Sequence, residues 1–178
     1  MKATPTDIPG VLVLEPQVFA DDRGSFFESF NERAFSQAVG RAVTFVQDNH
    51  STSRRHVLRG LHYQEPQPQG KLVRVVAGTI FDVAADIRPG SPTFSRWVGV
   101  ELSAENRRQL WVPEGLAHGF LVLSATAEVL YKTTAFYAPG CEKCIRWDDP
   151  TLAIRWPLTA EPVLSPRDAA ASLLDRPR

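Results

Sequence analysis

Residues 71–86 read KLVRVVAGTIFDVAAD and decide the fold class of this chain. Valine, isoleucine, leucine and phenylalanine dominate both halves of the stretch, and such residues favour extended backbone. Between the halves, Ala77-Gly78 supplies the small residues of a tight turn. The stretch therefore predicts two strands, Leu72–Val76 and Thr79–Asp86, connected by that turn.

The same pattern continues on both sides of this stretch. Glycines recur at short intervals, and fourteen prolines add further breaks between runs rich in Val, Ile, Leu, Phe, Thr and Trp. Short strands repeated about every eight to twelve residues are typical of an all-β sandwich, barrel or jelly roll. We expect further strands at Thr44–Asn49, Val57–Gln64, Phe94–Leu102, Ala117–Leu123 and Ala127–Thr134.

Helical patterns are few and short. Asn31 can cap a helix that runs to Val39, with Gly40 as its left-handed stop. Near the C-terminus, the stretch SPRD at 165–168 combines a capping serine, a first-turn proline and an acidic third position. Because no linker or repeat interrupts the chain, we expect one domain over residues 1–178, all-β with a few short helices, one of them C-terminal.

Composition and charge limit the possible functions. Apolar residues make up 43% of the 178 residues and charged residues 22%, as in a globular domain rather than a disordered chain. Twenty basic side chains balance twenty acidic ones, so the formal net charge is zero. No overall positive field therefore favours nucleic acid or an anionic membrane as a partner.

The sequence shows no clear signal for membrane insertion or secretion. No apolar run approaches the roughly 18 residues that a membrane-spanning helix needs, and the run at 11–14 stops at Glu15-Pro16, too early for a signal peptide. The chain contains two cysteines, Cys141 and Cys144, which agrees with a reducing compartment. We expect a cytoplasmic protein.

Two amide side chains occupy unusual positions on a predicted strand. Alternate residues of a strand face opposite sides, so Gln47 and Asn49 share a face with Phe45. Burying an amide without a partner costs about 1–3 kcal/mol. Either these amides bond to loop backbone, or the β-roll is hollow and they point toward a polar ligand.

The next strand favours the second possibility. Arg59 and His62 lie close together in its sequence, and Lys71 follows after a turn. Strict alternation would place Arg59 and His62 on opposite faces, so both can serve one pocket only if the strand bends. Gly60 is a plausible bulge for this purpose.

A second candidate histidine, His118, lies in a known pattern. The stretch Pro113–His118 resembles the second conserved segment of the cupin superfamily, Pro-x-Gly-x-x-His, whose histidine is a ligand in metal cupins. Such a metal site also needs a His-x-His pair followed by an acid, and His62 is followed by Tyr63 and Gln64. We therefore expect His118 to act through hydrogen bonds or proton transfer.

Two further motif classes carry little weight. Cys141-x-x-Cys144 is isolated, whereas zinc sites usually have a second pair and redox dithiols begin a helix; we interpret it as incidental. The chain has neither the Gly-x-Gly-x-x-Gly nor the Walker A pattern. Any phosphate must therefore be held by side chains.

Six segments occur in a recognisable order along the chain. They are DRGSFFE at 22–28, QDNHS at 47–51, RGLHYQ at 59–64, PEGLAHGF at 113–120, YK at 131–132 and WDDP at 147–150. Together they resemble the dTDP-4-dehydrorhamnose 3,5-epimerase family. The likeness extends from about Ile8 to Asp168, and six segments in order are a specific match.

The resemblance implies a cupin-type double-stranded β-helix, or jelly roll, that forms a homodimer and uses no metal or redox cofactor. The implied substrate is dTDP-4-dehydro-6-deoxy-glucose, whose C3 and C5 protons flank the C4 ketone; the product is dTDP-4-dehydro-rhamnose. Inverting these centres requires a base, an acid and a group that stabilises the enolate. Some relatives invert C3 or C5 alone, and this remains an alternative.

The resemblance also assigns catalytic roles. His62 matches the base, and its ordinary pKa near 6.5 suits proton abstraction close to neutrality. Asp168 matches the carboxylate partner of that base, although the helix cap at 165–168 competes for the same carboxylate. Tyr131 matches the acid on the opposite face, and Lys71 and His118 match groups near the ketone oxygen.

Further matches concern substrate binding. Arginine side chains suit a diphosphate because they form bidentate, charge-assisted hydrogen bonds. Two positions depart from the family pattern, with Arg167 where lysine is common and Cys144 where glycine is usual. The residues implied to hold nucleotide, diphosphate or sugar are Arg23, Glu28, Gln47, Asn49, Arg59, Lys71, His118, Glu142 and Arg167.

Two other functions stay open at this point. A metal-dependent cupin enzyme would use His118, His62 and either Glu28 or Glu142 as ligands. A nucleotide-sugar binding module without activity would bind the substrate but exchange no protons with solvent.

Overall fold

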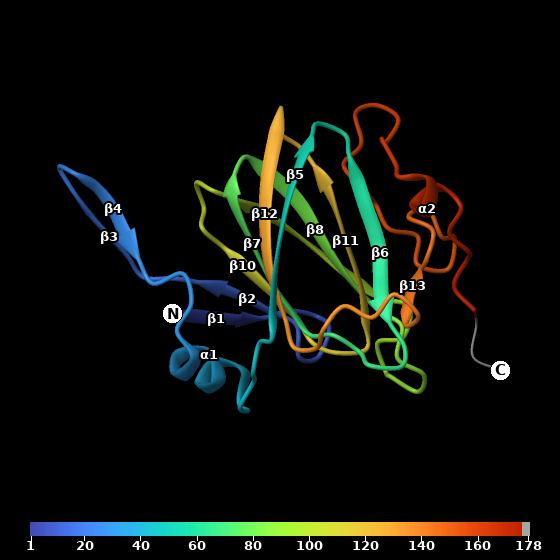
Figure 1. Cartoon of the computed structure of the whole chain (residues 1–178), viewed down its shortest axis with the longest axis horizontal. Coiled ribbons are helices and arrows are strands. Elements are labelled where there is room, and N and C mark those ends of the chain that lie inside the picture. The colour runs from blue at the N-terminus through green and yellow to red at the C-terminus, as the bar shows by residue number, and fades with distance from the viewer. Residues whose placement is uncertain (176–178) are drawn as a thin grey trace.

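Two antiparallel sheets face each other in the computed structural model, which describes residues 1–175 (Figure 1). The six-stranded sheet has the order β1 (Lys2–Pro5), β2 (Leu12–Glu15), β10 (Gln109–Val112), β7 (Lys71–Ala77), β12 (Thr126–Thr133) and β5 (Gln47–Arg54). The five-stranded sheet has the order β13 (Glu142–Cys144), β6 (Leu58–Gln64), β11 (Leu116–Val122), β8 (Thr79–Asp86) and β9 (Trp97–Ser103). This arrangement confirms the expected all-β jelly roll. The expected domain over residues 1–178 includes residues 176–178, which lie outside the described part.

The space between the sheets is filled by apolar side chains from both of them. Val73, Val75 and Val129 of the six-stranded sheet pack against Ile80 and Phe120 of the five-stranded one, and all five are buried. Burying a side chain of this size stabilises a fold by about 1.5–3 kcal/mol. The core therefore fixes the distance between the two sheets, and with it the dimensions of any cavity between them.

The stretch that decided the fold class forms β7 and β8, as predicted, but the two strands do not pair with each other. β7 lies between β10 and β12, whereas β8 lies between β11 and β9 in the other sheet. Gly78 takes a φ of 76°, and a Cβ there would approach the carbonyl oxygen of Thr126 to 2.0 Å. The turn therefore passes the chain from one sheet to the other.

A third element extends away from the two sheets. Strands β3 (Val18–Asp21) and β4 (Gly24–Phe27) pair only with each other, and this hairpin projects on the side opposite α2 (Figure 1). Its side chains include Phe19 and Phe26, which are 55% and 68% exposed. The hairpin thus presents apolar surface outside the core.

Both predicted helices are present. Helix α1 (Glu32–Val39) begins at Asn31, whose side chain accepts a hydrogen bond from the amide of Ala34, and ends at Gly40 with a φ of 77°. Helix α2 (Pro166–Ala169) begins at Ser165. No helix within residues 1–175 is long and apolar enough to cross a membrane.

Two strands begin three residues later than predicted, at Gln47 instead of Thr44 and at Trp97 instead of Phe94. The strand expected at Thr44–Asn49 begins at Gln47 and continues to Arg54, because Phe45 packs outside the sheet against Phe35 and Trp111. The strand expected from Phe94 begins at Trp97, because the preceding residues form turns in which the Ser95 amide bonds to the carbonyl of Asp86.

Candidate active site

A cavity of about 240 Å³ opens between the two sheets, and most of the residues that line it carry polar side chains. It is bordered by β5, β7 and β12 on one side and by β6, β11 and β13 on the other. The predicted site residues that line it are Gln47, Asn49, Arg59, His62, Lys71, His118, Tyr131 and Glu142.

Strand β5 places its two amides toward the cavity, as alternation predicts. Gln47 Nε2 donates to Asn49 Oδ1 at 2.8 Å, and Gln47 Oε1 accepts from the amide of Tyr137 at 2.9 Å. Both predicted possibilities for these amides are therefore confirmed in part. The Gln47 oxygen accepts a hydrogen bond from loop backbone, and the side chains of Gln47 and Asn49 also line the cavity. Tyr131 lies directly opposite Asn49 in the register of β12 and β5.

Strand β6 bends at Gly60, as predicted. Gly60 has a φ of 113°, and the pairing of β6 with β11 shifts register between His118 and Phe120. Because of this shift, Arg59 and His62 line the same cavity despite their odd spacing. Only glycine fits at position 60, since a Cβ would lie 2.7 Å from the backbone of strand β11.

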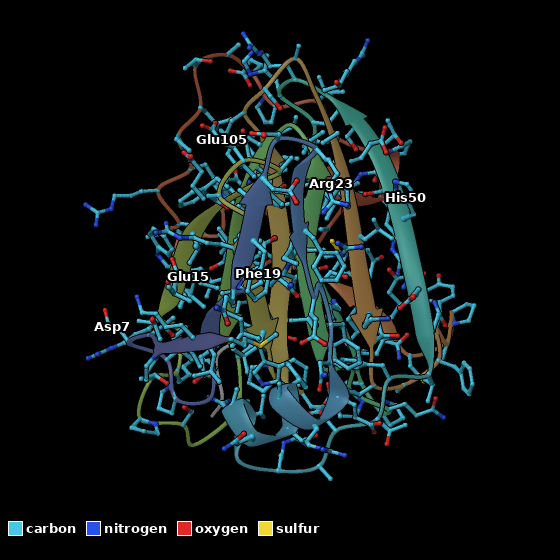
Figure 2. All side chains as sticks on the ribbon, turned by 90° about the vertical axis from the view of Figure 1, so that its left-hand side faces the viewer. Asp7, Glu15, Phe19, Arg23, His50 and Glu105 are labelled. Atoms are coloured by element: carbon cyan, nitrogen blue, oxygen red, sulfur yellow. The ribbon has the colours of Figure 1, made fainter. Side chains whose placement is uncertain are left out.

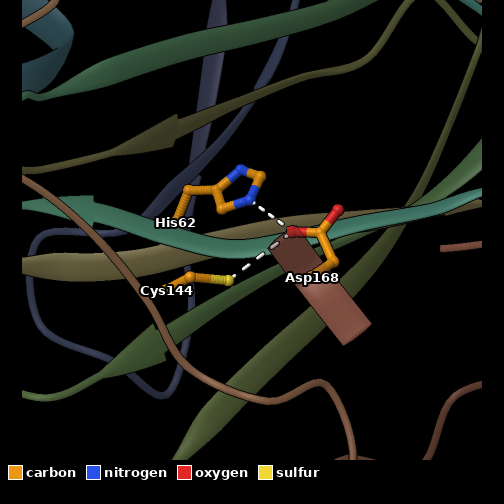
Figure 3. Close-up of side chains that lie close together, drawn as sticks. All are labelled: His62, Cys144 and Asp168. Carbon is orange, nitrogen blue, oxygen red and sulfur yellow. Dashed lines mark hydrogen bonds and ion pairs between the residues drawn. The ribbon is translucent and has the colours of Figure 1, made fainter. Parts of the chain in front are cut away.

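His62 forms a short hydrogen bond with Asp168 (Figure 3). The distance from His62 Nε2 to Asp168 Oδ1 is 2.6 Å, and the Asp168 side chain is 3% exposed. Burial raises the pKa of this carboxyl, but hydrogen bonds from His62 and Ser165 outweigh burial and hold the pKa below its ordinary value. An ionised carboxylate only accepts hydrogen bonds. Asp168 therefore keeps the proton of neutral His62 on Nε2 and leaves the lone pair on Nδ1.

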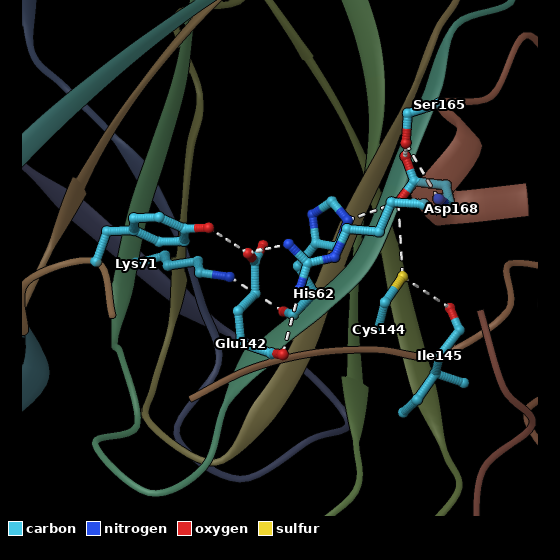
Figure 4. A network of polar contacts seen from close by, with 9 residues as sticks. His62, Lys71, Glu142, Cys144, Ile145, Ser165 and Asp168 are labelled. Carbon is cyan, nitrogen blue, oxygen red and sulfur yellow. Dashed lines mark hydrogen bonds and ion pairs between the residues drawn. The ribbon is translucent and has the colours of Figure 1, made fainter. Parts of the chain in front are cut away.

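Asp168 also belongs to the cap of helix α2, and the expectation that the two roles compete is wrong. Its amide donates to Ser165 Oγ at 3.1 Å, and Ser165 Oγ donates to Asp168 Oδ2 at 2.8 Å (Figure 4). The other oxygen, Oδ1, faces His62. The two roles use different atoms, so the cap orients the carboxylate toward the histidine.

Lys71 is a buried cation at the cavity wall. Its Nζ donates to the carbonyl oxygen of His62 at 3.1 Å. Burial lowers the pKa of Lys71 from 10.5 to about 8, and the negative charges of Asp82 and Glu142 limit the fall. The amine is therefore charged near pH 7 but holds its proton weakly.

A second carboxylate–histidine pair lies beside the first. His118 Nε2 is 2.8 Å from Asp82 Oδ1, and both side chains are buried. His118 is the cross-strand partner of His62 in β11 and β6. The sequence interpretation missed Asp82, although a carboxylate within the apolar run IFDVAAD was a usable indication.

Tyr131 reaches the cavity from the sheet that faces His62. It lies on β12 of the six-stranded sheet, whereas His62 lies on β6 of the five-stranded sheet (Figure 1). Burial raises the pKa of the Tyr131 phenol, and the charge of Arg59 opposes this only in part. The phenol therefore stays protonated at neutral pH on the opposite wall from the imidazole.

Glu142 and Arg167 form the rim beside this wall. Arg167 pairs with Glu142, and the hydroxyl of Tyr137 donates to Glu142 Oε2 at 2.7 Å. Glu142 itself lines the cavity, whereas Arg167 contacts it through Glu142. The predicted ligand residue Arg167 is thus adjacent to the cavity rather than on its wall.

Arg23 and Glu28 are not brought to the cavity. Arg23 lies in the turn of the β3–β4 hairpin, paired with Asp21 at 2.6 Å, and Figure 2 shows it with Phe19 on this projecting element. Glu28 follows the hairpin and accepts from Asn31 at 3.3 Å. Within one chain, these two predicted binding residues therefore lie away from the cavity.

Cys144 contacts the histidine–aspartate pair, which the interpretation of its motif as incidental did not foresee. Its Sγ is 3.5 Å from Asp168 Oδ1 (Figure 3). Burial and the adjacent negative charge of Asp168 raise the pKa of this thiol to about 12. Cys141 and Cys144 are both free thiols.

The ligand set of the metal-dependent alternative does not come together. Among residues 1–175, the ligand atoms that lie within 4.8 Å of one another belong to His62, Cys144 and Asp168. His118 is paired with Asp82, and Glu28 lies by the hairpin. The set of His118, His62 and a glutamate therefore offers no common centre for an ion.

Comparisons with known proteins identify the family of this chain. A family model described as dTDP-4-dehydrorhamnose 3,5-epimerase matches residues 5–176. The enzyme of that name from Pseudomonas aeruginosa is 64% identical over 168 residues, covering 94% of this chain and 93% of that protein. The one from Salmonella typhimurium is 60% identical over 172 residues, covering 96% and 94%.

A solved structure gives the same picture. It is the crystal structure of dTDP-6-deoxy-D-glucose-3,5-epimerase from Legionella pneumophila in complex with dTDP-4-keto-L-rhamnose. The two chains share 54% identity with a TM-score of 0.95, over 97% of this chain and 92% of that one.

Proposed function

The chain belongs to the dTDP-4-dehydrorhamnose 3,5-epimerase family, and we propose that His62 and Tyr131 transfer protons on opposite faces of its substrate. The enzyme is an isomerase that inverts C3 and C5 of dTDP-4-dehydro-6-deoxy-glucose in rhamnose biosynthesis. One observation carries the proposal: an imidazole and a phenol border one cavity from two facing sheets.

His62 removes the proton next to the ketone. Asp168 binds Nε2–H, so Nδ1 carries the lone pair, and Nδ1 has no hydrogen-bond partner among the described residues. Nδ1 can therefore accept a proton from C3 or C5, and the imidazolium that forms is stabilised by the buried carboxylate at 2.6 Å.

Lys71 and His118 stabilise the enolate that this step creates. Removing the proton moves negative charge onto the C4 oxygen, and a charged amine in a buried site stabilises such charge strongly. A hydrogen-bond donor of this kind contributes about 10²–10³ in rate. Lys71 is fixed for this purpose by the His62 carbonyl, and His118 by Asp82.

Tyr131 returns a proton to the opposite face of the carbon. Its phenol is neutral before the step and becomes a phenolate after it, while His62 becomes an imidazolium. Each inversion thus moves one proton from substrate to His62 and one from Tyr131 to substrate. Both groups return to their starting states by exchange with solvent.

The rest of the substrate binds around this centre. Arg59, held by Ser53 Oγ at 3.0 Å, supplies a guanidinium for the diphosphate, and the amides of Gln47 and Asn49 bind polar groups of the nucleotide or sugar. Glu142 with Arg167 completes the rim.

We further propose that residues 1–178 form one domain that acts as a cytoplasmic homodimer. The cavity of about 240 Å³ is smaller than the roughly 300–1,000 Å³ of typical ligand sites, and Arg23 and Glu28 lie on or next to a hairpin with exposed phenylalanines. A second copy that inserts this hairpin would bring both residues to the site. The two free thiols support a reducing compartment.

Solvent isotope exchange tests the proposed roles. In D₂O, the enzyme should place deuterium at both C3 and C5, as product NMR detects. His62→Asn should abolish exchange, whereas Tyr131→Phe should exchange protons without completing inversion. His50→Asn is the matched control, since His50 pairs with the exposed Glu128 on the outer face of β5. Full exchange by His62→Asn would overturn the assignment of the base.

A further inference from the structure

The contact between Cys144 and the His62–Asp168 pair brings three different ligand types together. A thiol, an imidazole and a carboxylate, one atom from each, lie within 4.8 Å of one another (Figure 3). We propose that these three side chains form a binding site for a thiophilic divalent cation such as Zn²⁺, and that the bound ion switches the epimerase off.

The donor set and its dimensions suit such an ion. Zinc binds imidazole nitrogen, thiolate sulfur and carboxylate oxygen at about 2.0–2.3 Å, which places tetrahedral ligand atoms about 3.5 Å apart. Cys144 Sγ and Asp168 Oδ1 already stand at 3.5 Å, and the 2.6 Å contact of His62 with Asp168 must open by about 1 Å. Ser165 Oγ donates a hydrogen bond to the second carboxylate oxygen, and such outer hydrogen bonds usually orient the ligands of a metal ion.

Two of the three proposed ligands border different cavities. Cys144 lines a second cavity of about 740 Å³, bordered also by residues 172–175, whereas His62 lines the first cavity. Cys144 and His62 therefore border two different cavities, and Asp168 lines neither. A water molecule would serve as the fourth ligand of a tetrahedral ion.

Binding would disable His62 through its tautomer. A neutral imidazole has one lone pair, and in the resting site this lone pair is on Nδ1. An ion on Nε2 takes the lone pair there, so the proton of Nε2 moves to Nδ1 and the base is lost. Cys144 releases its thiol proton to solvent as it becomes a thiolate, so one proton leaves for each ion bound. No redox change occurs.

This mechanism predicts a particular kinetic pattern. The ion removes the base but leaves Arg59, Gln47 and Asn49 in place, so Zn²⁺ should lower kcat and change KM by less than about twofold. A chelator should restore the rate. The expected fall in kcat rests on the proposed role of His62 as the base. Metal binding does not depend on that role, because it can be measured in the absence of substrate.

Cobalt absorption and zinc inhibition test the two parts separately. Titration of the metal-free protein with CoCl₂ should produce one equivalent of thiolate-to-cobalt charge-transfer absorption in the near ultraviolet. The band should disappear in Cys144→Gly and Cys144→Ala and persist in Cys141→Ser, the matched control. The Zn²⁺ concentration that halves each variant's own rate should rise at least about tenfold in both Cys144 variants.

The possible results distinguish the metal site from its effect on catalysis. Absence of the band in the unaltered protein, or its persistence in both Cys144 variants, would refute the metal site. A Cys144-dependent band together with unchanged turnover at saturating Zn²⁺ would refute the inhibition and contradict His62 as the base. A Cys144-dependent band with a chelator-reversible fall in kcat would establish both.

Discussion

Replacement of Lys71 by methionine should raise the stability of the protein while removing most of its activity. The ammonium group of Lys71 is buried, and burial lowers its pKa from 10.5 to about 8. At 1.36 kcal/mol per pH unit, keeping this amine charged in the folded state costs about 3 kcal/mol. Methionine has a similar shape without the charge, so Lys71→Met should increase the free energy of unfolding at pH 7 by up to about 3 kcal/mol.

The pH dependence of stability follows from the difference between the pKa of Lys71 in the folded state and its ordinary value of 10.5. Below pH 8 the amine is protonated in both the folded and unfolded states, so the cost is fully present. Between pH 8 and 10.5 the unfolded state binds more protons at Lys71, so this residue makes the free energy of unfolding rise with pH in the unaltered protein. Above about pH 9 the Cys144 thiol, whose pKa is raised to about 12, contributes in the opposite direction, so the rise should be clearest between pH 8 and 9. In Lys71→Met this rise should be absent.

Activity should respond to pH in the opposite direction. The charged amine stabilises the enolate, so kcat/KM should fall above a midpoint near pH 8, where Lys71 loses its proton. Tyr131 cannot cause this fall, because burial raises its pKa above the ordinary value of 10.0. Lys71→Met should lower kcat by about 10²–10³ and abolish the dependence near pH 8.

Urea unfolding between pH 6 and 10.5, combined with steady-state kinetics over the same range, measures both effects. Lys143→Met is the matched control, because Lys143 is exposed and pairs with Glu65 at the surface. Its stability should change by less than about 1 kcal/mol and its pH profile should be normal. The reasoning would be refuted if Lys71→Met were less stable than the parent at pH 7 and kept the alkaline fall in rate.

Three further changes probe other parts of the structure. Asp168→Asn should lower kcat by about 10³–10⁴, because an amide no longer fixes the tautomer of the base; a loss below tenfold in steady-state assays would contradict the pair. Gly60→Ala should destabilise the protein by more than about 2 kcal/mol in urea unfolding, since its Cβ meets the backbone of Gly119 at 2.7 Å. Gly24→Ala is its control, with a similar φ of 124° but open space around the Cβ, and an equal loss there would show that strain alone matters. Arg23→Ala should weaken dTDP binding about 10- to 100-fold in calorimetry if a second copy supplies this residue, and unchanged affinity would argue against that role.

Local rules predicted much of the fold from sequence. The strands at 72–76 and 79–86 are present to within a residue at either end, because apolar β-formers and a turn glycine determine them locally. Asn31 and Gly40 bound α1 for the same reason, since capping depends on a few adjacent residues.

Pairing between distant segments was not visible in the sequence. β10 and β13 contain four and three residues, and each exists because a partner strand lies beside it. Likewise, the turn at Gly78 indicates a reversal but not that its two strands belong to different sheets. Such features depend on contacts far apart in the chain.

In the site, too, features set by adjacent residues were predictable from the sequence, and features set by distant contacts were not. Alternation placed Gln47 and Asn49 inward, and the glycine at position 60 indicated the bend that brings His62 to the cavity. Nothing near Cys144 indicated its neighbour, because Asp168 lies 24 residues away and reaches it only through the helix cap. The motif around Arg23 predicted a binding residue, but it did not indicate that Arg23 lies on a hairpin that projects from the two sheets.

The tautomer of His62 is the central claim that can be tested most directly. Nitrogen-15 NMR of the protein labelled at its four histidines, with His62 assigned from the signal missing in His62→Asn, reports which ring nitrogen carries the proton. The geometry predicts a protonated Nε2 and a lone pair on Nδ1 in the neutral ring. A neutral His62 with its proton on Nδ1 would contradict the account, because no base would then face the sugar.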